Sequence, residues 1–561
     1  MKNLKNGQRL HTGKCLKPLS RGILLGTMVL LCVTTGPLFG QEKSRKMRVV
    51  PKWERFETEF KSAVTYTNPL QEATLKVVFN SPLGTKTQIE GFWDGARTWR
   101  VRFNPDQPGR WTYNTSCSDS ANRGLNGQQG EFLCTTIVGE GRFQQHGPVR
   151  VARDRRHFEH ADGTPFFWLG DTALSGARLS TPPDWELYAA VRQSQGYSVT
   201  QCAAAPGDDQ KGESALTGFP DRIGVNPEFF KRLDAKLETL RRADLLSAIV
   251  PLWETDTSKA QLKQDQAVLV LRYMVARWGT DPIAWLLEFP GDNPEKLAER
   301  WRKIGRAVFG GALHAPVIVN AGLAPGVLET FRSEDWVDAL GLQTAGPKGG
   351  PEQRQAFAAE STKEPARPLI GFTPYENALK TSDNSGGRYS AEAVRQAAYW
   401  GVLLAPAAGV SYGGAGVVDW DATTDQTKTP GARLPLWQRS LFMPAAKQMG
   451  YLGRVFNSLD FSQLRPNEKL LISPSGDEAV AAGTAVASTG AKDLVLVYVP
   501  EGRALRVSQD AMPPSPQIRW FNPRTSGSGP AVAVVSGSTC QFPPPGPGDW
   551  LLTMRTQEKT K

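Results

Sequence analysis

Eight short apolar runs alternate with amphipathic segments between about Gly147 and Gly450, and this alternation constrains the fold more than any other feature of the chain. Apolar runs that are each followed by a helical pattern predict parallel strands joined by helical crossovers. Eight such units predict a (β/α)8 TIM barrel. The predicted strands are residues 166–170, 197–202, 246–253, 283–289, 316–321, 339–345, 368–375 and 409–414, and the predicted helices include 227–243, 294–308 and 391–404.

A doubly wound parallel sheet is the competing prediction for the same alternation. That fold places a glycine-rich phosphate-binding turn directly after its first strand. The sequence after residues 166–170 has no such turn, so the barrel is favoured.

The segments on either side of the predicted barrel have the pattern of β-structure. Trp99, Val101 and Phe103 alternate with arginines, as one face of a half-buried strand does. The 55 glycines and 41 prolines follow no fixed period and indicate many turns. The predicted organisation is a signal peptide at 1–40, an N-terminal β-sandwich at 47–140, the barrel at 145–450 and a C-terminal β-sandwich at 452–556.

Cys117 and Cys134 bracket a glycine- and asparagine-rich loop and are expected to form a disulfide across a hairpin.

The first 41 residues contain six basic side chains and no acid, and an apolar run spans residues 23–39. This pattern is typical of a secretory signal peptide, and an uncleaved signal anchor is the alternative. We therefore expect the rest of the chain to be secreted, periplasmic or extracellular, with no membrane contact other than an uncleaved anchor. Six of the eleven net positive charges lie in this segment and the others are dispersed, so no nucleic-acid partner is expected.

The chemistry of the predicted strand ends is that of carboxylates and aromatic rings. The chain has only five histidines and no HExxH or P-loop motif, which disfavours a histidine metal centre or a serine triad. Two carboxylates framed by aromatic rings suit the hydrolysis of glycosidic bonds, because one protonates the leaving oxygen while the other attacks or activates water. The residues of this kind near strand ends are Asp171, Trp253, Glu254, Trp285, Glu288, Asp292, Tyr375, Glu376, Tyr412 and Asp419.

Glu288 ends the fourth predicted strand and Glu376 ends the seventh. Because the carboxyl ends of barrel strands form the active face, these two acids are expected to meet in the mouth. A separation of about 5 to 5.5 Å would indicate a retaining enzyme, and about 6.5 to 9.5 Å an inverting one. The alternative is that one or both acids are paired with an arginine or with a helix N-terminus.

Several motifs resemble the apiosidase-like glycoside hydrolases. In the barrel these are residues 166–173 (FFWLGDTA), 196–201 (GYSVTQ), Trp278 and 394–400 (VRQAAYW). Residues 91–95 and 109–113 resemble the N-terminal β-sandwich that often precedes such barrels, and residues 494–500, 520–524 and 548–550 resemble a module named for collagen binding. The resemblance implies a secreted hydrolase that acts on side chains of plant or algal polysaccharides through barrel acids.

The sequence also departs from the family pattern. Residues 285–292 are two residues longer than the family's Trp-x-x-Gly-Gly-Asp motif, so either Glu288 or Asp292 matches its acid. In the family's Asp-Gly-Glu-Pro-x-Tyr-Glu motif, Phe372 stands at the first Glu and Glu376 at the last. Leu174 and Asn320 replace a Trp and a His.

The predicted catalytic residues are Glu376 as nucleophile or base and Asp292 or Glu288 as acid. The predicted substrate-binding residues are Asp171, Trp253, Trp285, Asn320, Gln343, Tyr375 and Tyr412. The predicted partner is a polysaccharide or oligosaccharide, with no metal or other cofactor. The alternative function is a catalytically inactive barrel that binds glycans or serves as a scaffold.

Overall fold

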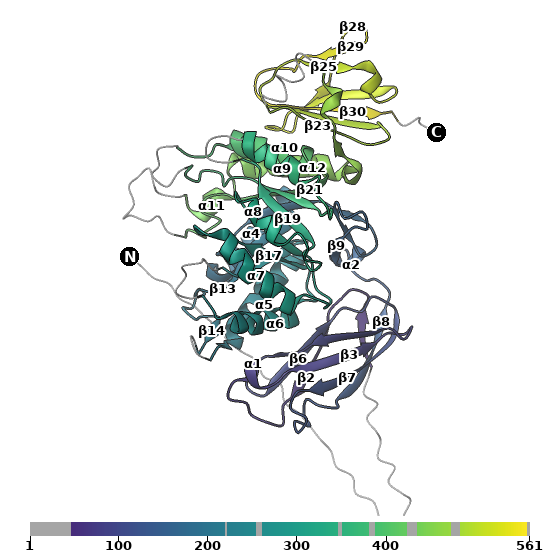
Figure 1. Cartoon of the computed structure of the whole chain (residues 1–561). Coiled ribbons are helices and arrows are strands. Elements are labelled where there is room, and N and C mark those ends of the chain that lie inside the picture. The colour runs from purple at the N-terminus through teal and green to yellow at the C-terminus, as the bar shows by residue number, and fades with distance from the viewer. Residues whose placement is uncertain are drawn as a thin grey trace, which may run out of the picture. The chain divides into compact units, whose positions relative to one another are not determined.

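The computed structural model describes residues 47–218, 222–253, 261–345, 351–380, 387–422, 435–472 and 483–557 (Figure 1). The predicted signal peptide and Glu254 lie outside the described residues. A closed barrel of eight parallel strands occupies the middle of the chain, and sheet-rich regions precede and follow it. The predicted fold class is therefore confirmed.

The N-terminal region consists of two sheets around one apolar core. Its five-stranded sheet has the order β1-β8-β7-β3-β4 and its three-stranded sheet has the order β2-β6-β5. The predicted alternation holds, since Trp99 and Val101 point into this core and Phe103 stacks on Phe79 with ring centroids 4.1 Å apart. The elements are β1 (Arg48–Pro51), β2 (Phe56–Lys61), α1 (Pro69–Glu72), β3 (Leu75–Asn80), β4 (Lys86–Glu90), β5 (Phe92–Trp93), β6 (Thr98–Phe103), β7 (Gly109–Cys117) and β8 (Gln129–Thr135).

The expected disulfide between Cys117 and Cys134 is wrong. Both cysteines are free. Strand β7 pairs with β8 so that Gly109 lies opposite Cys134, while Cys117 is at the other end of β7. At roughly 3.4 Å per residue, the two sulfur atoms are held at opposite ends of the ladder and cannot form a bond.

The barrel strands follow the predicted order. They are β12 (Trp168–Thr172), β13 (Val199–Ala205), β16 (Leu246–Leu252), β17 (Ile283–Glu288), β18 (Val317–Asn320), β19 (Ala339–Gln343), β20 (Leu369–Phe372) and β21 (Ala407–Tyr412). The short strands β14 (Leu216–Thr217) and β15 (Gly224–Val225) form a separate hairpin. All eight predicted strands are confirmed, with ends shifted by a few residues.

Helices cover the outside of the barrel, and several begin at strong start signals. Asn226 and Asn293 cap helices whose first residue is Pro227 or Pro294, and Ser390 caps a third. The helices are α3 (Gly176–Leu179), α4 (Pro182–Gln195), α5 (Pro227–Arg242), α6 (Gln264–Trp278), α7 (Pro294–Val308), α8 (Gly326–Thr330), α9 (Pro351–Glu360), α10 (Ala391–Leu403), α11 (Trp437–Ser440) and α12 (Pro444–Asn457). The predicted helices 227–243, 294–308 and 391–404 correspond to α5, α7 and α10.

A small sheet packs at the amino-terminal end of the barrel. It has the order β11-β10-β9 and follows helix α2. Phe143, Phe158 and Phe166 from this region belong to the same apolar cluster as the interior of the barrel. The bottom of the barrel is thus filled with aromatic side chains. The elements are α2 (Arg142–His146), β9 (Val149–Val151), β10 (Phe158–His160) and β11 (Pro165–Phe166).

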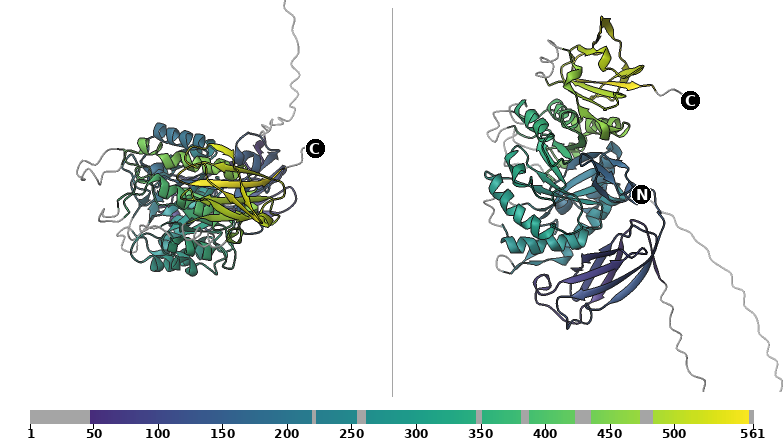
Figure 2. Two further views of the ribbon diagram at one scale, coloured as in Figure 1. Left: turned by 90° about the horizontal axis from the view of Figure 1, so that it is seen from above. Right: turned by 45° about the vertical axis from the view of Figure 1, so that its right-hand side comes forward.

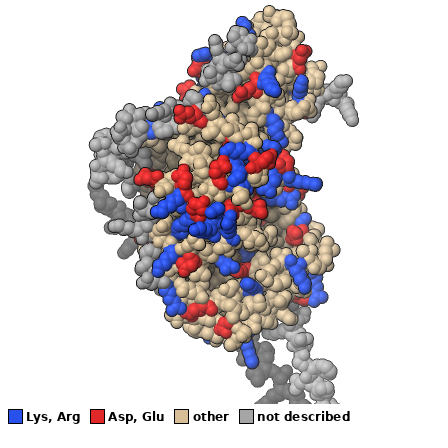
Figure 3. Space-filling view, viewed as in Figure 1, with Lys and Arg blue, Asp and Glu red and all other residues tan. Residues whose placement is uncertain are grey.

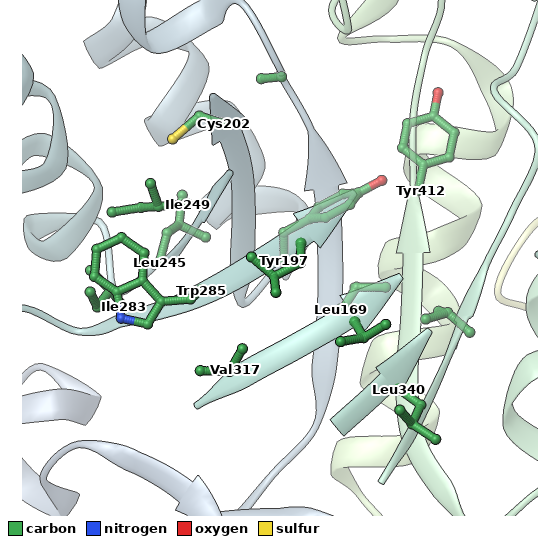
Figure 4. Close-up of a cluster of buried hydrophobic side chains, with 14 of the residues drawn as sticks. Leu169, Tyr197, Cys202, Leu245, Ile249, Ile283, Trp285, Val317, Leu340 and Tyr412 are labelled. Atoms are coloured by element: carbon green, nitrogen blue, oxygen red, sulfur yellow. The ribbon is translucent and has the colours of Figure 1, made fainter. Parts of the chain in front are cut away.

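Each barrel strand contributes to two different cores. The interior is filled by residues such as Trp168, Leu286 and Ile370. The layer between strands and helices contains Trp285 and Tyr412, which Figure 4 shows with their neighbours. Which core a residue joins decides whether it can reach the mouth.

The C-terminal region is again built from two sheets, of order β22-β23-β24-β30-β26-β27 and β25-β29-β28. Arg395 of α10 binds both carboxylate oxygens of Asp549, at 2.6 and 2.8 Å, and Tyr399 stacks on Tyr498 with centroids 4.4 Å apart. Figure 2 shows the same sheets in two further orientations. The elements are β22 (Arg465–Pro466), β23 (Ala485–Ser488), β24 (Leu494–Val499), β25 (Leu505–Ser508), β26 (Pro516–Phe521), β27 (Ser528–Pro530), β28 (Val534–Ser536), β29 (Thr539–Phe542) and β30 (Trp550–Thr556).

Among the described helices, none is both long enough and apolar enough to span a bilayer. On the face shown in Figure 3, basic and acidic side chains intermingle over the middle of the molecule. Neighbouring charges of opposite sign form ion pairs in this protein, for example Arg306 with Glu334 and Arg332 with Glu360.

Candidate active site

The carboxyl ends of strands β17 and β18 bring Glu288 and Asn320 side by side. The two residues are register partners in the parallel ladder. Nδ2 of Asn320 donates hydrogen bonds to both carboxylate oxygens of Glu288, at 2.9 and 3.0 Å. The amide therefore fixes the orientation of the carboxyl group.

Glu288 and Asn320 line an open pocket of about 350 Å³ at this end of the barrel. Its other walls come from the loops after the two strands, namely residues 289–291, Pro294 and residues 321–324. Burial raises the pKa of Glu288 to about 7, and the hydrogen bonds from Asn320 offset part of that rise. A carboxyl group that is half protonated near neutral pH can serve as a general acid.

Tyr375 follows β20 and lies near Glu288 and a second carboxylate, Asp419. Its ring lies against Gly413, where an added Cβ would come within 2.4 Å of Tyr375 Cδ1. Its pKa is raised, first by burial of the hydroxyl end and then by the charges of Glu288 and Asp419. Both carboxylates are therefore close enough to act on one phenol group.

Polar side chains inside the barrel lie near this mouth. Gln201 donates to Ser411 Oγ at 2.6 Å and accepts from Thr172 Oγ1 at 2.7 Å. The Thr172 hydroxyl also interacts with Tyr375. Trp253 is partly buried against the apolar interior at the end of β16. Thr172, Gln201 and Ser411 are buried and hydrogen-bond one another, so they support the mouth from below and do not line the Glu288 pocket.

The structure does not bring Glu376 together with Glu288. Glu376 is 4% exposed, and its carboxylate accepts hydrogen bonds from Tyr412 Oη at 2.7 Å and from the backbone N–H of Ala445 at 3.2 Å. Ala445 is in the first turn of α12, so Glu376 is bound at a helix N-terminus. The geometry agrees with the alternative expected for this acid and does not support its prediction as nucleophile.

The side chains of three residues predicted to contact substrate lie outside the mouth. Asp171 is fully buried and pairs with Arg192 Nε at 2.7 Å and Tyr188 Oη at 2.8 Å, both from α4. Trp285 is fully buried in the layer between the barrel strands and the helices, beside Ile283 in Figure 4. Tyr412, which holds Glu376, belongs to the same layer. Since neighbouring residues of a strand point to opposite faces, these side chains point away from the barrel interior.

The remaining predictions divide between the mouth and its surroundings. Asp292 is exposed in the loop before α7 and is not among the residues that line the Glu288 pocket. Gln343 ends β19 and pairs in register with Phe372. Phe372 is 6% exposed and lies against Gly341, next to Asn320. An apolar ring therefore stands where the family motif has its first glutamate.

The sequence analysis missed the roles of Thr172, Gln201 and Ser411. Thr172 and Ser411 lie at the carboxyl ends of β12 and β21 and Gln201 lies within β13, but serine, threonine and glutamine occur in strands for many reasons and give no distinctive signal. Asp419 was noted only as one of several acids near strand ends. In the described part of the chain, no cluster of three or more potential ligands is placed to bind a metal ion.

A TIM barrel with a carboxyl group of raised pKa in its mouth has the fold and the site of a glycoside hydrolase. Residues 152–463 match the family described as "Apiosidase-like, catalytic domain", and the chain belongs to this family. Residues 49–118 match a domain of unknown function, DUF5060, and residues 466–555 match the "Putative collagen-binding domain of a collagenase". A search of the curated proteins finds no match.

Solved structures share the fold at low sequence identity. A "putative glycoside hydrolase" from Bacteroides vulgatus is 18% identical with a TM-score of 0.69, and the match covers 91% of this chain and 100% of that one. A glycoside hydrolase family 5 protein from the same organism is 18% identical with a TM-score of 0.65, covering 74% and 94%. A third, named a glycoside hydrolase, has 18% identity and a TM-score of 0.66, covering 75% and 99%. The family and the fold together support an enzyme that hydrolyses glycosidic bonds.

Proposed function

We propose that the chain hydrolyses O-glycosidic bonds in side chains of plant or algal polysaccharides, outside the cytoplasm, with Glu288 as general acid. One observation carries the proposal: Glu288 ends β17, lines the open pocket, and has a pKa raised to about 7 by burial. At neutral pH a large fraction of this group still holds the proton that the leaving oxygen needs. The plant or algal substrate and the location rest on the family and on the sequence of residues 1–41.

Asn320 has a defined part in this step. Its amide donates to both oxygens of Glu288. When Glu288 gives its proton to the leaving oxygen, the new carboxylate keeps these two hydrogen bonds. The amide thus stabilises the charge that forms and prevents the side chain from turning away.

Asp419 is the proposed base. The charges of Asp419 and Glu288 both raise the pKa of Tyr375, so both acids lie near its phenol group. Phe372 removes the strand-seven glutamate that would attack the sugar directly. We therefore propose that Asp419 activates a water molecule and that the product has inverted anomeric configuration.

The test is to incubate the full chain with plant and algal polysaccharides and with aryl glycosides, including apiosides, and to measure released sugar. Glu288→Gln keeps the side chain's shape but cannot donate an acidic proton, so sugar release should fall by at least a hundredfold. Asp292→Asn is the matched control, because Asp292 is exposed on the loop that follows the same strand. Proton NMR of the first product formed gives its anomeric configuration. Equal activity of Glu288→Gln and the wild type would contradict the assignment.

A catalytically inactive, glycan-binding barrel is the second candidate, and Phe372 favours it. Because β20 ends at Phe372, Glu288 is the one glutamate that ends a barrel strand in the described part of the chain. Glycan binding without sugar release from any substrate of the panel would support this function.

A further inference from the structure

We propose a second ligand site, between the N-terminal β-sandwich and the barrel, that binds a neutral, hydroxyl-rich molecule such as one or two units of a glycan. A cavity of about 300 Å³ lies there, within the usual size range of small-molecule sites. It is lined by Trp53, Glu54, Arg55, Glu57, Asn104, Phe143, Gln144, Pro148, Arg241, Thr280, Asp281 and Pro282. We call it the sandwich–barrel cavity. The proposal does not depend on the barrel being an active hydrolase.

The sandwich–barrel cavity is separate from the mouth. Asp281 precedes the first residue of β17, whereas Glu288 is the last residue of that strand. At about 3.3 Å per residue, the two carboxyl groups lie roughly 20 Å apart along the strand direction. One molecule of monosaccharide size cannot occupy both places.

The cavity wall contains polar atoms that the protein does not satisfy. Within the described residues, Oδ1 of Asn104 and Oγ1 of Thr280 are buried without a hydrogen-bond partner. Asp281 contacts Arg55 through Oδ1 at 3.0 Å, and its side chain is 8% exposed. Buried polar atoms are nearly always paired in native proteins, so the two unpaired atoms of Asn104 and Thr280 call for an external partner. A sugar hydroxyl can donate to Asn104 or Asp281 and accept from Thr280.

The charges around the cavity argue against an ionic ligand. Arg55 lies 3.2 Å from Glu238 as well as 3.0 Å from Asp281, and Arg241 lies 2.8 Å from Glu238 and 3.5 Å from Glu54. Because these guanidinium groups already face carboxylates, they offer little attraction to a phosphate. Among the described residues, no group of three or more histidine, cysteine or acidic side chains lies here in a position to bind a metal cation.

Apolar groups form the rest of the wall. Trp53, Phe143 and two prolines supply surfaces that suit the C–H faces of a sugar ring. Trp53 has a φ of 67°, and its backbone N–H donates to the carbonyl of Pro105 at 2.8 Å. A bulky residue is costly in this left-handed region, and such strain collects at ligand sites. Burial also raises the pKa of Asp281, which reflects a carboxylate with too few donors around it.

The experiment is isothermal titration of the full chain with xylobiose, cellobiose and galactobiose, and separately with inorganic phosphate and calcium chloride. The test protein is the double variant Thr280→Val, Asp281→Asn, which keeps the shape of both side chains and removes the hydroxyl and the charge. Thr553→Val, in the C-terminal region, is the matched control. Thermal unfolding establishes that each variant is folded, and Thr280→Val alone is used if the double variant is not.

We expect at least one disaccharide to bind, with affinity at least tenfold weaker in the Thr280 variants and unchanged in Thr553→Val. If the mouth also binds the sugar, the variants lose one of two sites. If the mouth binds no sugar, the variants lose the binding that the wild type shows, so the two proposals fail independently. Equal sugar binding in wild type and variants, binding of phosphate or calcium in place of sugar, or no binding of any probe would overturn the proposal.

Discussion

Glu288, the proposed general acid, keeps its proton to unusually high pH because its carboxyl group is buried. A general acid must be protonated, and burial has moved the pKa of this group from about 4.5 to about 7. We therefore expect kcat/KM to fall as pH rises, with a midpoint near pH 7 in the free enzyme. The measurement is a pH profile on an aryl glycoside between pH 4 and 9. Asp292→Asn should show the same falling limb, and an unchanged rate up to pH 9 would rule out Glu288 as the acid.

The raised pKa of Glu288 also predicts how the free energy of unfolding depends on pH. The folded state binds more protons than the unfolded state between about pH 4.5 and 7, so the stability contributed by protonated Glu288 is lost as pH rises through this window. Glu288→Gln has no proton to lose. We expect this variant to be more stable than the wild type at pH 8 and similar to it at pH 4, measured by urea unfolding. A variant that is less stable at pH 8 would contradict the buried, uncompensated carboxylate.

Residue-level signals in the sequence placed Glu288 and Glu376 at strand ends but could not predict that Glu376 is bound at a helix N-terminus. Both acids follow an apolar strand, and the difference lies in contacts made by distant segments. Ala445, which donates to Glu376, is 69 positions further along the chain. The sequence did not show that Tyr412 and Trp285 point toward the helices. Barrel strands are buried on both faces, so their residues do not alternate between apolar and polar, and the sequence cannot show which side chains face the interior.

At the level of elements, Glu376 ties strand β20 to the start of helix α12. In Glu376→Gln the amide can still accept from Tyr412, but an NH2 group replaces one of the acceptor oxygens at the helix terminus. We expect a loss of about 1 to 3 kcal/mol in unfolding free energy. Because Tyr375 precedes Glu376, we also expect a partial loss of kcat and not its abolition. Urea unfolding and steady-state kinetics on the same preparation measure both, and complete loss of kcat in a variant of wild-type stability would restore Glu376 as a catalytic residue.

The elements themselves were largely predictable. All eight barrel strands have apolar runs, and three helices begin with an asparagine or serine cap. Helices α4, α6 and α12 were not predicted, although α12 carries the N–H group that binds Glu376. Its first residue is Pro444 and no side chain caps it, so the usual start signal is weak.

At the level of the whole molecule, Arg395 and Asp549 join the barrel helix α10 to the C-terminal sheets. Both side chains are almost fully buried, and Asp549 also accepts from Tyr498 Oη at 2.9 Å. Asp549→Ala leaves a buried arginine unpaired, which costs about 3 to 5 kcal/mol. We expect calorimetry to show the C-terminal region unfolding before the barrel in this variant. Asp510→Ala, an exposed acid of the same region, is the control, and identical traces for the two variants would show that the ion pair contributes nothing.

The aromatic side chains at the bottom of the barrel have a kinetic consequence. Phe143, Phe158 and Phe166 join the interior core, and Trp168 and Leu286 continue it toward the mouth. Among the described residues this packed core closes the barrel below the mouth, so we expect a sugar to enter and a product to leave on the side of the mouth. We therefore expect turnover on a long polymer to be sensitive to the concentration of the released sugar.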